Sequence, residues 1–132
     1  MLPSQVAANT LCAMFKETLR EIVDGTYGSV GGVVMDAEGF AVETYTRDDA
    51  TFDVNSVGVE FGVALTSIRR AAESLETGEA QEMVVGTERL ITVIRTLGSN
   101  YFLAVAYGPN ANVGKGRFLM RLSVPKLLAA LS

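Results

Sequence analysis

Residues 28–46 read GSVGGVVMDAEGFAVETYT and predict a β-hairpin. The first strand, Val30 to Asp36, has no polar face, which is typical of a strand covered on both sides of a sheet. Asp36 to Gly39 is predicted to be the turn, because aspartate can cap a turn with its own side chain and glycine accepts a positive φ. Phe40 to Thr46 is the returning strand, with Phe40 and Val42 on one face.

An amphipathic helix is predicted on each side of this hairpin. Residues 4–24 form the first, with Ser4 as its N-cap, Gly25 as its stop and Cys12 beside its apolar row as a small buried residue. Residues 55–76 form the second, capped by Asp53 or Asn55. Two rows are expected to face the core: Leu11, Phe15, Leu19 and Ile22 in the first helix, and Val57, Phe61, Ala64, Leu65, Ile68, Ala72 and Leu75 in the second.

The opposite face of the second helix is unusually apolar. It carries Val59, Val63, Thr66 and Arg70, with Gly62 next to them. A solvated face is normally charged, and two valines in line beside a glycine indicate a packed surface. A partner protein is the favoured occupant, and a second helix of the same subunit is the alternative.

Three more strands and a last helix follow. The strands are predicted at residues 81–86, from 87 or 88 to 96, and at 101–107, with short turns that imply antiparallel neighbours. Residues 101–107 are almost wholly apolar, which places that strand at the centre. If residues 81–86 lie at the sheet edge, pairing with a second copy would satisfy them. The last helix spans about 111–131 and is expected to break or kink at Pro125, with Ser123 capping its final piece.

These elements predict one α+β domain over residues 1–132. The order is α-β-β-α-β-β-β-α, a profilin-like arrangement in which one five-stranded antiparallel sheet carries helices on both faces. Neither repeats nor linkers interrupt it.

Composition excludes several classes of chemistry. The chain has 132 residues, no histidine, one cysteine and a net charge of −4. Without histidine it cannot build a Ser-His-Asp triad or a His-ligated metal site within one chain, and one cysteine allows no intrachain disulfide. The acidic balance argues against nucleic acid as a partner. No signal peptide or bilayer-length apolar run is recognisable, so a cytoplasmic protein without membrane insertion is expected.

Two segments resemble ligand sites without meeting their requirements. Residues 108–116 follow a strand and open a helix, but they have the wrong spacing for a P-loop and Gly116 where Ser or Thr would bind magnesium. Asp48, Asp49 and Asp53 are acidic neighbours without the spacing of a calcium loop. We therefore expect no catalytic residue, no metal and no cofactor, and a protein that is not an enzyme.

The last predicted helix carries four of the eleven basic residues and no acidic residue. Lys115 and Lys126 fall on one side of it, and Arg117 and Arg121 on nearly the opposite side. They are interpreted as solvated flanks of an apolar helix, with an acidic partner or a membrane surface as the alternatives.

Residues 31–42, GGVVMDAEGFAV, resemble the first hairpin of roadblock/dynein light chain domains. The helix from Asn55, the strand Val84-Val85-Gly86, and residues 101–105 followed by 112–117 fit the rest of that family. The resemblance implies homodimers formed through the middle helix and the third strand. It also implies binding to small Ras-like GTPases, as in bacterial members of the MglB type, some of which stimulate GTP hydrolysis; other members are scaffolds.

Carried onto this sequence, the resemblance implies a dimer or partner interface. The residues are Val59, Gly62, Val63, Thr66, Arg69 and Arg70 of the middle helix, and Met83, Val84 and Val85 of the third strand. The expected function is a non-catalytic homodimeric adaptor or regulator of a small Ras-like GTPase. If hydrolysis is stimulated, repositioning of the GTPase's own residues is favoured over an arginine finger from Arg69 or Arg70.

A small-ligand sensor is the alternative function. Gly31 and Gly32 could leave room against the sheet, and Tyr101 and Tyr107 could line it. The same glycines could instead admit close packing of a helix on the sheet, which is the favoured interpretation.

Overall fold

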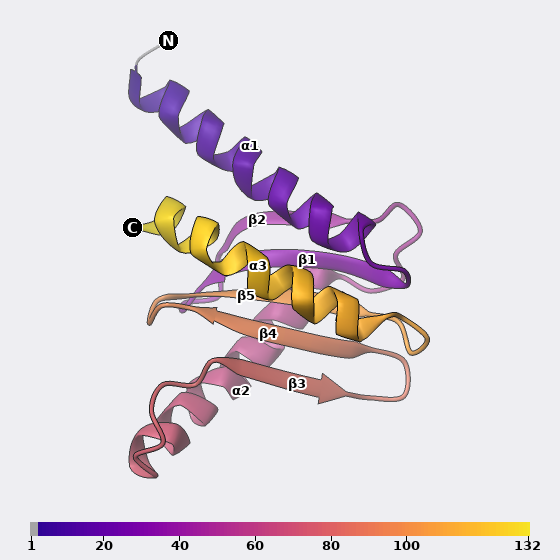
Figure 1. Cartoon of the computed structure of the whole chain (residues 1–132), viewed down its shortest axis with the longest axis vertical. Helices are drawn as coiled ribbons and strands as arrows, with labels where there is room; N and C mark the ends of the chain where they lie inside the picture. Colours follow the sequence, from indigo (N-terminus) through magenta and orange to yellow (C-terminus); the bar gives the residue numbers. More distant parts are fainter. Residues whose placement is uncertain (1–2) are drawn as a thin grey trace.

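The computed structural model describes the backbone of residues 3–132 and the side chains of residues 9–132. The elements, labelled in Figure 1, are α1 (Pro3–Asp24), β1 (Ser29–Asp36), β2 (Ala41–Thr46), α2 (Val54–Ser74), β3 (Glu82–Gly86), β4 (Ile91–Leu97), β5 (Tyr101–Tyr107) and α3 (Val113–Leu131). The strands form one antiparallel sheet in the order β2-β1-β5-β4-β3. The predicted element order and fold class are confirmed, and β3 lies at an edge.

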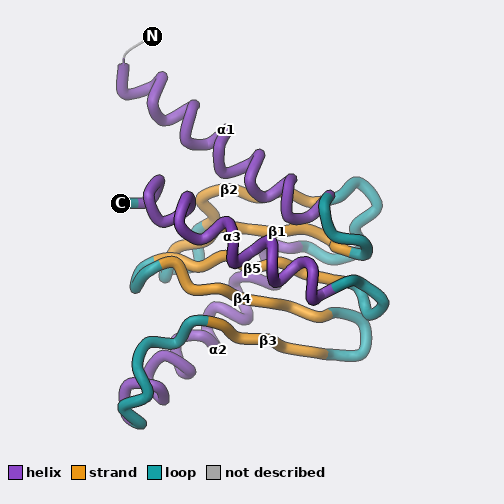
Figure 2. Tube along the Cα trace, in the orientation of Figure 1, coloured by secondary structure: helices purple, strands orange, loops and turns teal. Residues whose placement is uncertain are grey.

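Three helices cover the two faces of this sheet. Figures 1 and 2 show α1 and α3 on one face and α2 on the other. Residues of the central strand alternate between the two layers: Leu103 and Val105 pack with Leu19 and Met120 under α1 and α3, whereas Phe102 packs with residues of α2. β5 is therefore covered on both faces, as its apolar run predicts.

The hairpin turn forms through the side chain of Asp36. Its carboxylate accepts the backbone N–H groups of Glu38 (2.9 Å) and Phe40 (3.0 Å), and Gly39 has a φ of +92°. Because Phe40 belongs to this turn, β2 begins one residue later than predicted, at Ala41. The expectation of Phe40 on a strand face is wrong, and its side chain is exposed.

The N-terminal half of α1 differs from the prediction in its start and in its burial. α1 begins at Pro3, so Ser4 lies inside the helix, and the side chain of Ser4 is outside the described residues. Figure 1 shows that the N-terminal half of α1 projects beyond the sheet. Leu11 and Cys12 are exposed for that reason, contrary to the expected burial of this part of the row.

α3 continues through Pro125 without a break. Ser123 does not cap a separate piece: it is buried, and its hydroxyl donates to the carbonyl of Leu119 (2.9 Å). The helix begins at Val113, two residues after the predicted start, and its N-cap is Asn112, whose side chain accepts the N–H of Lys115.

A polar cluster ties α3 to the edge strand. Glu82 of β3 binds Arg117 of α3 and lies 3.6 Å from the guanidinium of Arg95 on β4. The Glu82 side chain is only 18% exposed. Its carboxylate thus links three elements at a site partly shielded from water.

We expect Glu82→Gln to lower the free energy of unfolding by about 1 kcal/mol, because the amide keeps one hydrogen bond but loses both ionic contacts. Urea denaturation followed by circular dichroism measures it. Glu17→Gln is the matched control, since Glu17 pairs with Arg20 at 3.7 Å in an exposed position. Equal effects of the two substitutions would contradict the structural role of Glu82.

Candidate protein-interaction surface

α2 buries less of its apolar face than the sequence predicts. Of the predicted row, Leu65 is buried and Val57, Phe61 and Ala72 are half-buried, but Ala64, Ile68 and Leu75 are exposed. For Ile68 and Leu75 the reason is length: 21 residues of helix span about 31 Å, whereas five strands span only about 19 Å. α2 crosses the sheet obliquely, and in Figure 1 its C-terminal end extends past β3.

The outer face of α2 is exposed, as its composition predicts. Val63 is 69% exposed and Val59 is 41% exposed, and Thr66 and Arg70 are exposed beside them. No second helix covers these valines in the described part of the chain, so the alternative of an intrachain cover does not hold there. Two sizeable apolar side chains remain in water on one line of the helix.

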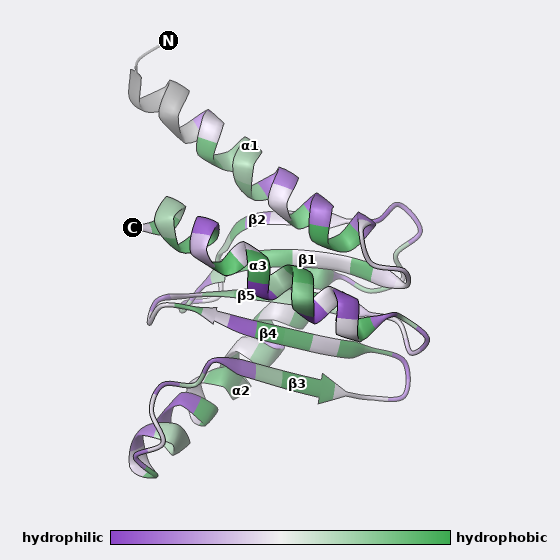
Figure 3. Cartoon of the chain, in the orientation of Figure 1, coloured by the Kyte–Doolittle hydropathy of each residue, from purple (hydrophilic) through white to green (hydrophobic). Residues whose placement is uncertain are grey.

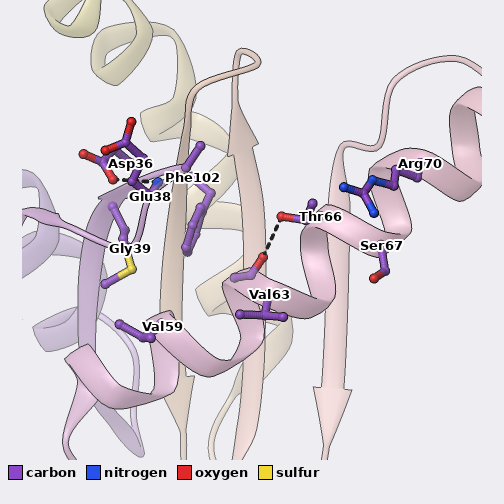
Figure 4. Close-up of a pocket in the computed structure, with 13 residues that line it drawn as sticks. Asp36, Glu38, Gly39, Val59, Val63, Thr66, Ser67, Arg70 and Phe102 are labelled. Carbon is purple, nitrogen blue, oxygen red and sulfur yellow. Dashed lines mark hydrogen bonds between the residues drawn. The ribbon is translucent and has the colours of Figure 1, made fainter.

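These residues form one wall of a groove, here called the α2 groove, of about 330 Å³ between α2 and the β1–β2 turn (Figure 4). Its lining is Met35, Asp36, Ala37, Glu38, Gly39, Gly58, Val59, Gly62, Val63, Thr66, Ser67, Arg70 and Phe102. Gly58 and Gly62 lie at the points where α2 approaches the sheet most tightly. A Cβ at Gly58 would lie 3.0 Å from Met35, and a Cβ at Gly62 would lie 3.0 Å from Phe102. α2 can therefore lie close against the sheet.

Charge is distributed unevenly along the α2 groove. Asp36 and Glu38 lie at the hairpin end, Arg70 lies at the other end, and valines occupy the middle (Figure 4). Thr66 donates its hydroxyl to the carbonyl of Gly62 at 3.3 Å, so it is partly satisfied within the helix. This pattern suits a protein segment with an apolar centre and polar ends.

The two neighbouring arginines have different roles. Arg69 turns toward its own chain, where its guanidinium donates to the carbonyl of Gly98 in the β4–β5 turn (3.2 Å) and to that of Tyr101 at the start of β5 (3.5 Å). Arg70 lines the α2 groove. The structure thus separates two residues that the sequence places together in the interface.

The edge strand β3 holds the remaining predicted residues. Val84 is exposed, whereas Met83 and Val85 are half-buried, and Met83 packs against the core cluster under α2. Met83–Val85 do not line the α2 groove. The structure therefore brings Val59, Gly62, Val63, Thr66 and Arg70 together and places Met83–Val85 at a separate edge. Ile68 and Leu75, which the sequence predicts to face the core, are also exposed. The length of the predicted helix, compared with the width of a five-stranded sheet, could have indicated this exposure.

The residues proposed for a small ligand do not surround a common space. A Cβ at Gly31 would lie 2.7 Å from a methyl group of Val54, and one at Gly32 would lie 3.3 Å from a methyl group of Leu19. Tyr107 is fully buried under α3, and burial raises its pKa. The glycines admit close packing of helices on both faces of the sheet, which is the favoured interpretation from the sequence.

The acidic loop before α2 supplies the N-cap of that helix. Asp53 caps α2, accepting from the N–H of Asn55 (3.0 Å) and the hydroxyl of Ser56 (2.9 Å). Among residues 9–132, no group of three or more Cys, Asp or Glu side chains is placed to hold a metal ion. None of the helices in the described chain has the length and apolar character needed to cross a bilayer.

Comparison with solved structures identifies proteins that share this fold. No family profile matches the chain, and no curated protein does. MglC from Myxococcus xanthus is 37% identical, with 87% of this chain and 97% of that chain covered and a TM-score of 0.64. The gliding protein MglB from Thermus thermophilus is 18% identical, with 91% and 90% covered and a TM-score of 0.81.

A roadblock/LC7 domain from Streptomyces avermitilis is similar as well. It is 17% identical, with 88% of this chain and 96% of that chain covered and a TM-score of 0.77. The two structures below 20% identity show a shared fold, and the identity with MglC extends over almost the whole of that protein. The chain therefore belongs to the roadblock/LC7 family and has the fold of MglB and MglC.

Proposed function

We propose that this protein is a homodimeric adaptor or regulator that binds a small Ras-like GTPase. The observation that carries the proposal is the exposed apolar centre of the α2 groove, formed by Val59 and Val63. A groove that is apolar in the middle and charged at its ends is suited to a protein partner. GTPase binding is also what the resemblance to MglB-type members implies.

The edge of the sheet supports the homodimer. β3 has unpaired backbone groups along its outer side, and pairing with the β3 of a second copy would extend the sheet. A two-fold axis through such a junction, perpendicular to the sheet, places both α2 helices on the same face. The C-terminal end of each α2, with exposed Ile68 and Leu75, would then extend over the other copy.

This arrangement divides the predicted interface between two contacts. Met83, Val84 and Val85 belong to the β3 edge and hence to the subunit contact. Val59, Gly62, Val63, Thr66 and Arg70 line the α2 groove, which we assign to the GTPase. Arg69 contributes by fixing the β4–β5 turn, because its guanidinium is bound to its own chain.

Binding to the small Ras-like GTPases of the source organism tests the proposal. Each GTPase is immobilised with GDP or with a non-hydrolysable GTP analogue, and binding is measured by biolayer interferometry. We expect one of them to bind the wild-type protein and to bind Val63→Glu at least about tenfold more weakly, because a carboxylate would enter the apolar centre of the groove.

Two controls make this result specific. Phe118→Ser, on the opposite face of the sheet, should leave GTPase binding unchanged. Light scattering should give Val63→Glu the same mass as wild type. A monomeric Val63→Glu would instead assign the valines to the subunit contact. If no GTPase binds in either nucleotide state, the proposed function is wrong.

Stimulated hydrolysis is assayed with the GTPase that binds. An Arg69→Ala, Arg70→Ala variant that retains binding should retain any stimulation, since Arg69 is engaged in the fold and Arg70 projects from a rigid helix. Loss of all stimulation with binding retained would establish an arginine finger.

A further inference from the structure

The outward side of α3 carries a second exposed apolar surface, far from the α2 groove. Phe118 is 54% exposed and Leu122 is 61% exposed, and Pro125 and Ala129 continue the line in exposed positions. We call these four residues the α3 row. The opposite side of the helix packs on the sheet through Met120 and Leu127, so the α3 row is not a shifted core face. Figure 3 shows apolar and hydrophilic positions side by side on the outward surface of α3.

Positive charges border the α3 row on both sides. Residues 108–132 contain four basic side chains and no acidic one. Arg117 is bound to Glu82, and Lys126 lies 3.5 Å from Glu21. Lys115 and Arg121, on opposite flanks of the row, form no ion pair with any described residue. Two cations are therefore available to a partner.

A hollow of about 140 Å³ lies beside Leu122, between α1 and α3. It is lined by Glu21, Ile22, Leu119, Leu122, Ser123 and Lys126. The hollow has room for one apolar side chain and has a lysine at its rim. A pocket next to an exposed apolar row is the usual position for an anchoring residue of a partner.

We propose that the α3 row is a docking surface for an acidic amphipathic helix of another protein. The row repeats at intervals of four, three and four residues and spans about 16 Å, which matches about three turns of a partner helix. Acidic side chains on that helix would lie opposite Lys115 and Arg121. This surface is independent of the α2 groove and of the proposed GTPase.

Charge argues against two other occupants. A second copy of α3 would place Lys115 and Arg121 against the same basic residues, with no acidic side chain on either helix to offset them. An anionic membrane is usually bound by a cluster of about four or more basic side chains, whereas α3 has only two cations, Lys115 and Arg121, that form no ion pair with a described residue. These two suffice for two acidic side chains of one helix. An acidic helix uses both the apolar row and the two unpaired cations.

A synthetic peptide serves as the probe. It is an 18-residue amphipathic helix with leucine on one face and glutamate elsewhere, labelled with fluorescein and measured by fluorescence anisotropy. We expect it to bind the wild-type protein at least about tenfold more tightly than a peptide with lysine in place of glutamate. The Phe118→Ser, Leu122→Ser variant should lose this binding, whereas Val63→Ser should retain it. Thermal denaturation checks that the exposed substitutions leave the fold intact.

Charge reversal distinguishes specific docking from nonspecific hydrophobic binding. In Lys115→Glu, Arg121→Glu the preference should shift toward the lysine peptide, by at least about tenfold. Equal binding of both peptides, or no binding of the acidic peptide, overturns the proposal. Stronger binding to vesicles containing phosphatidylserine would assign the α3 row to a membrane. A fall in the mass of the wild-type assembly on Phe118→Ser, Leu122→Ser would assign it to a subunit contact. Because GTPase binding is measured separately, either proposal can fail without the other.

Discussion

Gly116→Ala is expected to lower the free energy of unfolding by about 2 kcal/mol. Alanine in place of glycine inside a helix normally stabilises by up to about 1 kcal/mol. At this position, however, a Cβ would overlap the ring of Tyr107. Overpacking of this kind typically costs about 1–3 kcal/mol, and the Tyr107 ring is fully buried. We expect a cost at the upper end of that range, so the steric effect outweighs the gain in helix propensity.

Tyr107 is held from several sides. It is fully buried on the face of β5 that α3 covers, and its hydroxyl lies 3.2 Å from the sulfur of Met120. To relieve the overlap, either the ring must leave its position or α3 must move away from the sheet. Movement of α3 would also weaken the contact between Arg117 and Glu82.

Gly114→Ala is the matched control, because it lies in the same helix two residues earlier. A Cβ at Gly114 would have only the side chain of Asn112 nearby, at 3.9 Å. Urea denaturation should therefore give Gly114→Ala the stability of the wild type or slightly more, and separate the two variants by about 2–3 kcal/mol. Equal stabilities would mean that α3 does not lie against Tyr107 as described.

The hairpin shows what local sequence chemistry can predict. Asp36 and Gly39 specify a turn by short-range hydrogen bonding and a positive φ, and both do what their residue types imply. The apolar run at residues 101–107 likewise placed β5 at the centre, because a strand without a polar face must be covered on both sides. These features depend on neighbours within a few residues or on one pattern along one strand.

The features that the sequence did not predict depend on contacts between elements that are far apart in the chain. The periodicity of α2 identified apolar positions, but Ile68 and Leu75 are exposed because the helix extends past the sheet beneath it. Gly116 stands where a P-loop would need Ser or Thr, and the sequence does not indicate that this glycine lies against Tyr107, nine positions away. Arg69 and Arg70 are adjacent in sequence, and only the path of α2 over the β4–β5 turn distinguishes them.

The edge strand β3 offers the most direct test of the proposed homodimer. Thr87 donates to Leu90, and Thr96 donates to the carbonyl of Gln81. In an antiparallel pair the backbone groups alternate in direction, so odd-numbered residues from 81 to 87 face β4. The N–H and carbonyl groups of Val84 therefore face outward, where a second β3 would pair.

Val84→Pro is expected to convert the dimer to a monomer without unfolding it. Proline removes the outward N–H and adds a ring at the pairing edge, but the hydrogen bonds to β4 come from its neighbours. Because both copies lose the contact, we expect the dissociation constant to rise at least about 100-fold. Light scattering across a dilution series should then give 14.1 kDa for Val84→Pro and twice that mass for the wild type. Val84→Thr keeps the N–H and should remain dimeric. A monomeric wild type would rule out the homodimer, and a folded but dimeric Val84→Pro would move the subunit contact away from β3, leaving α2 as the surface to test.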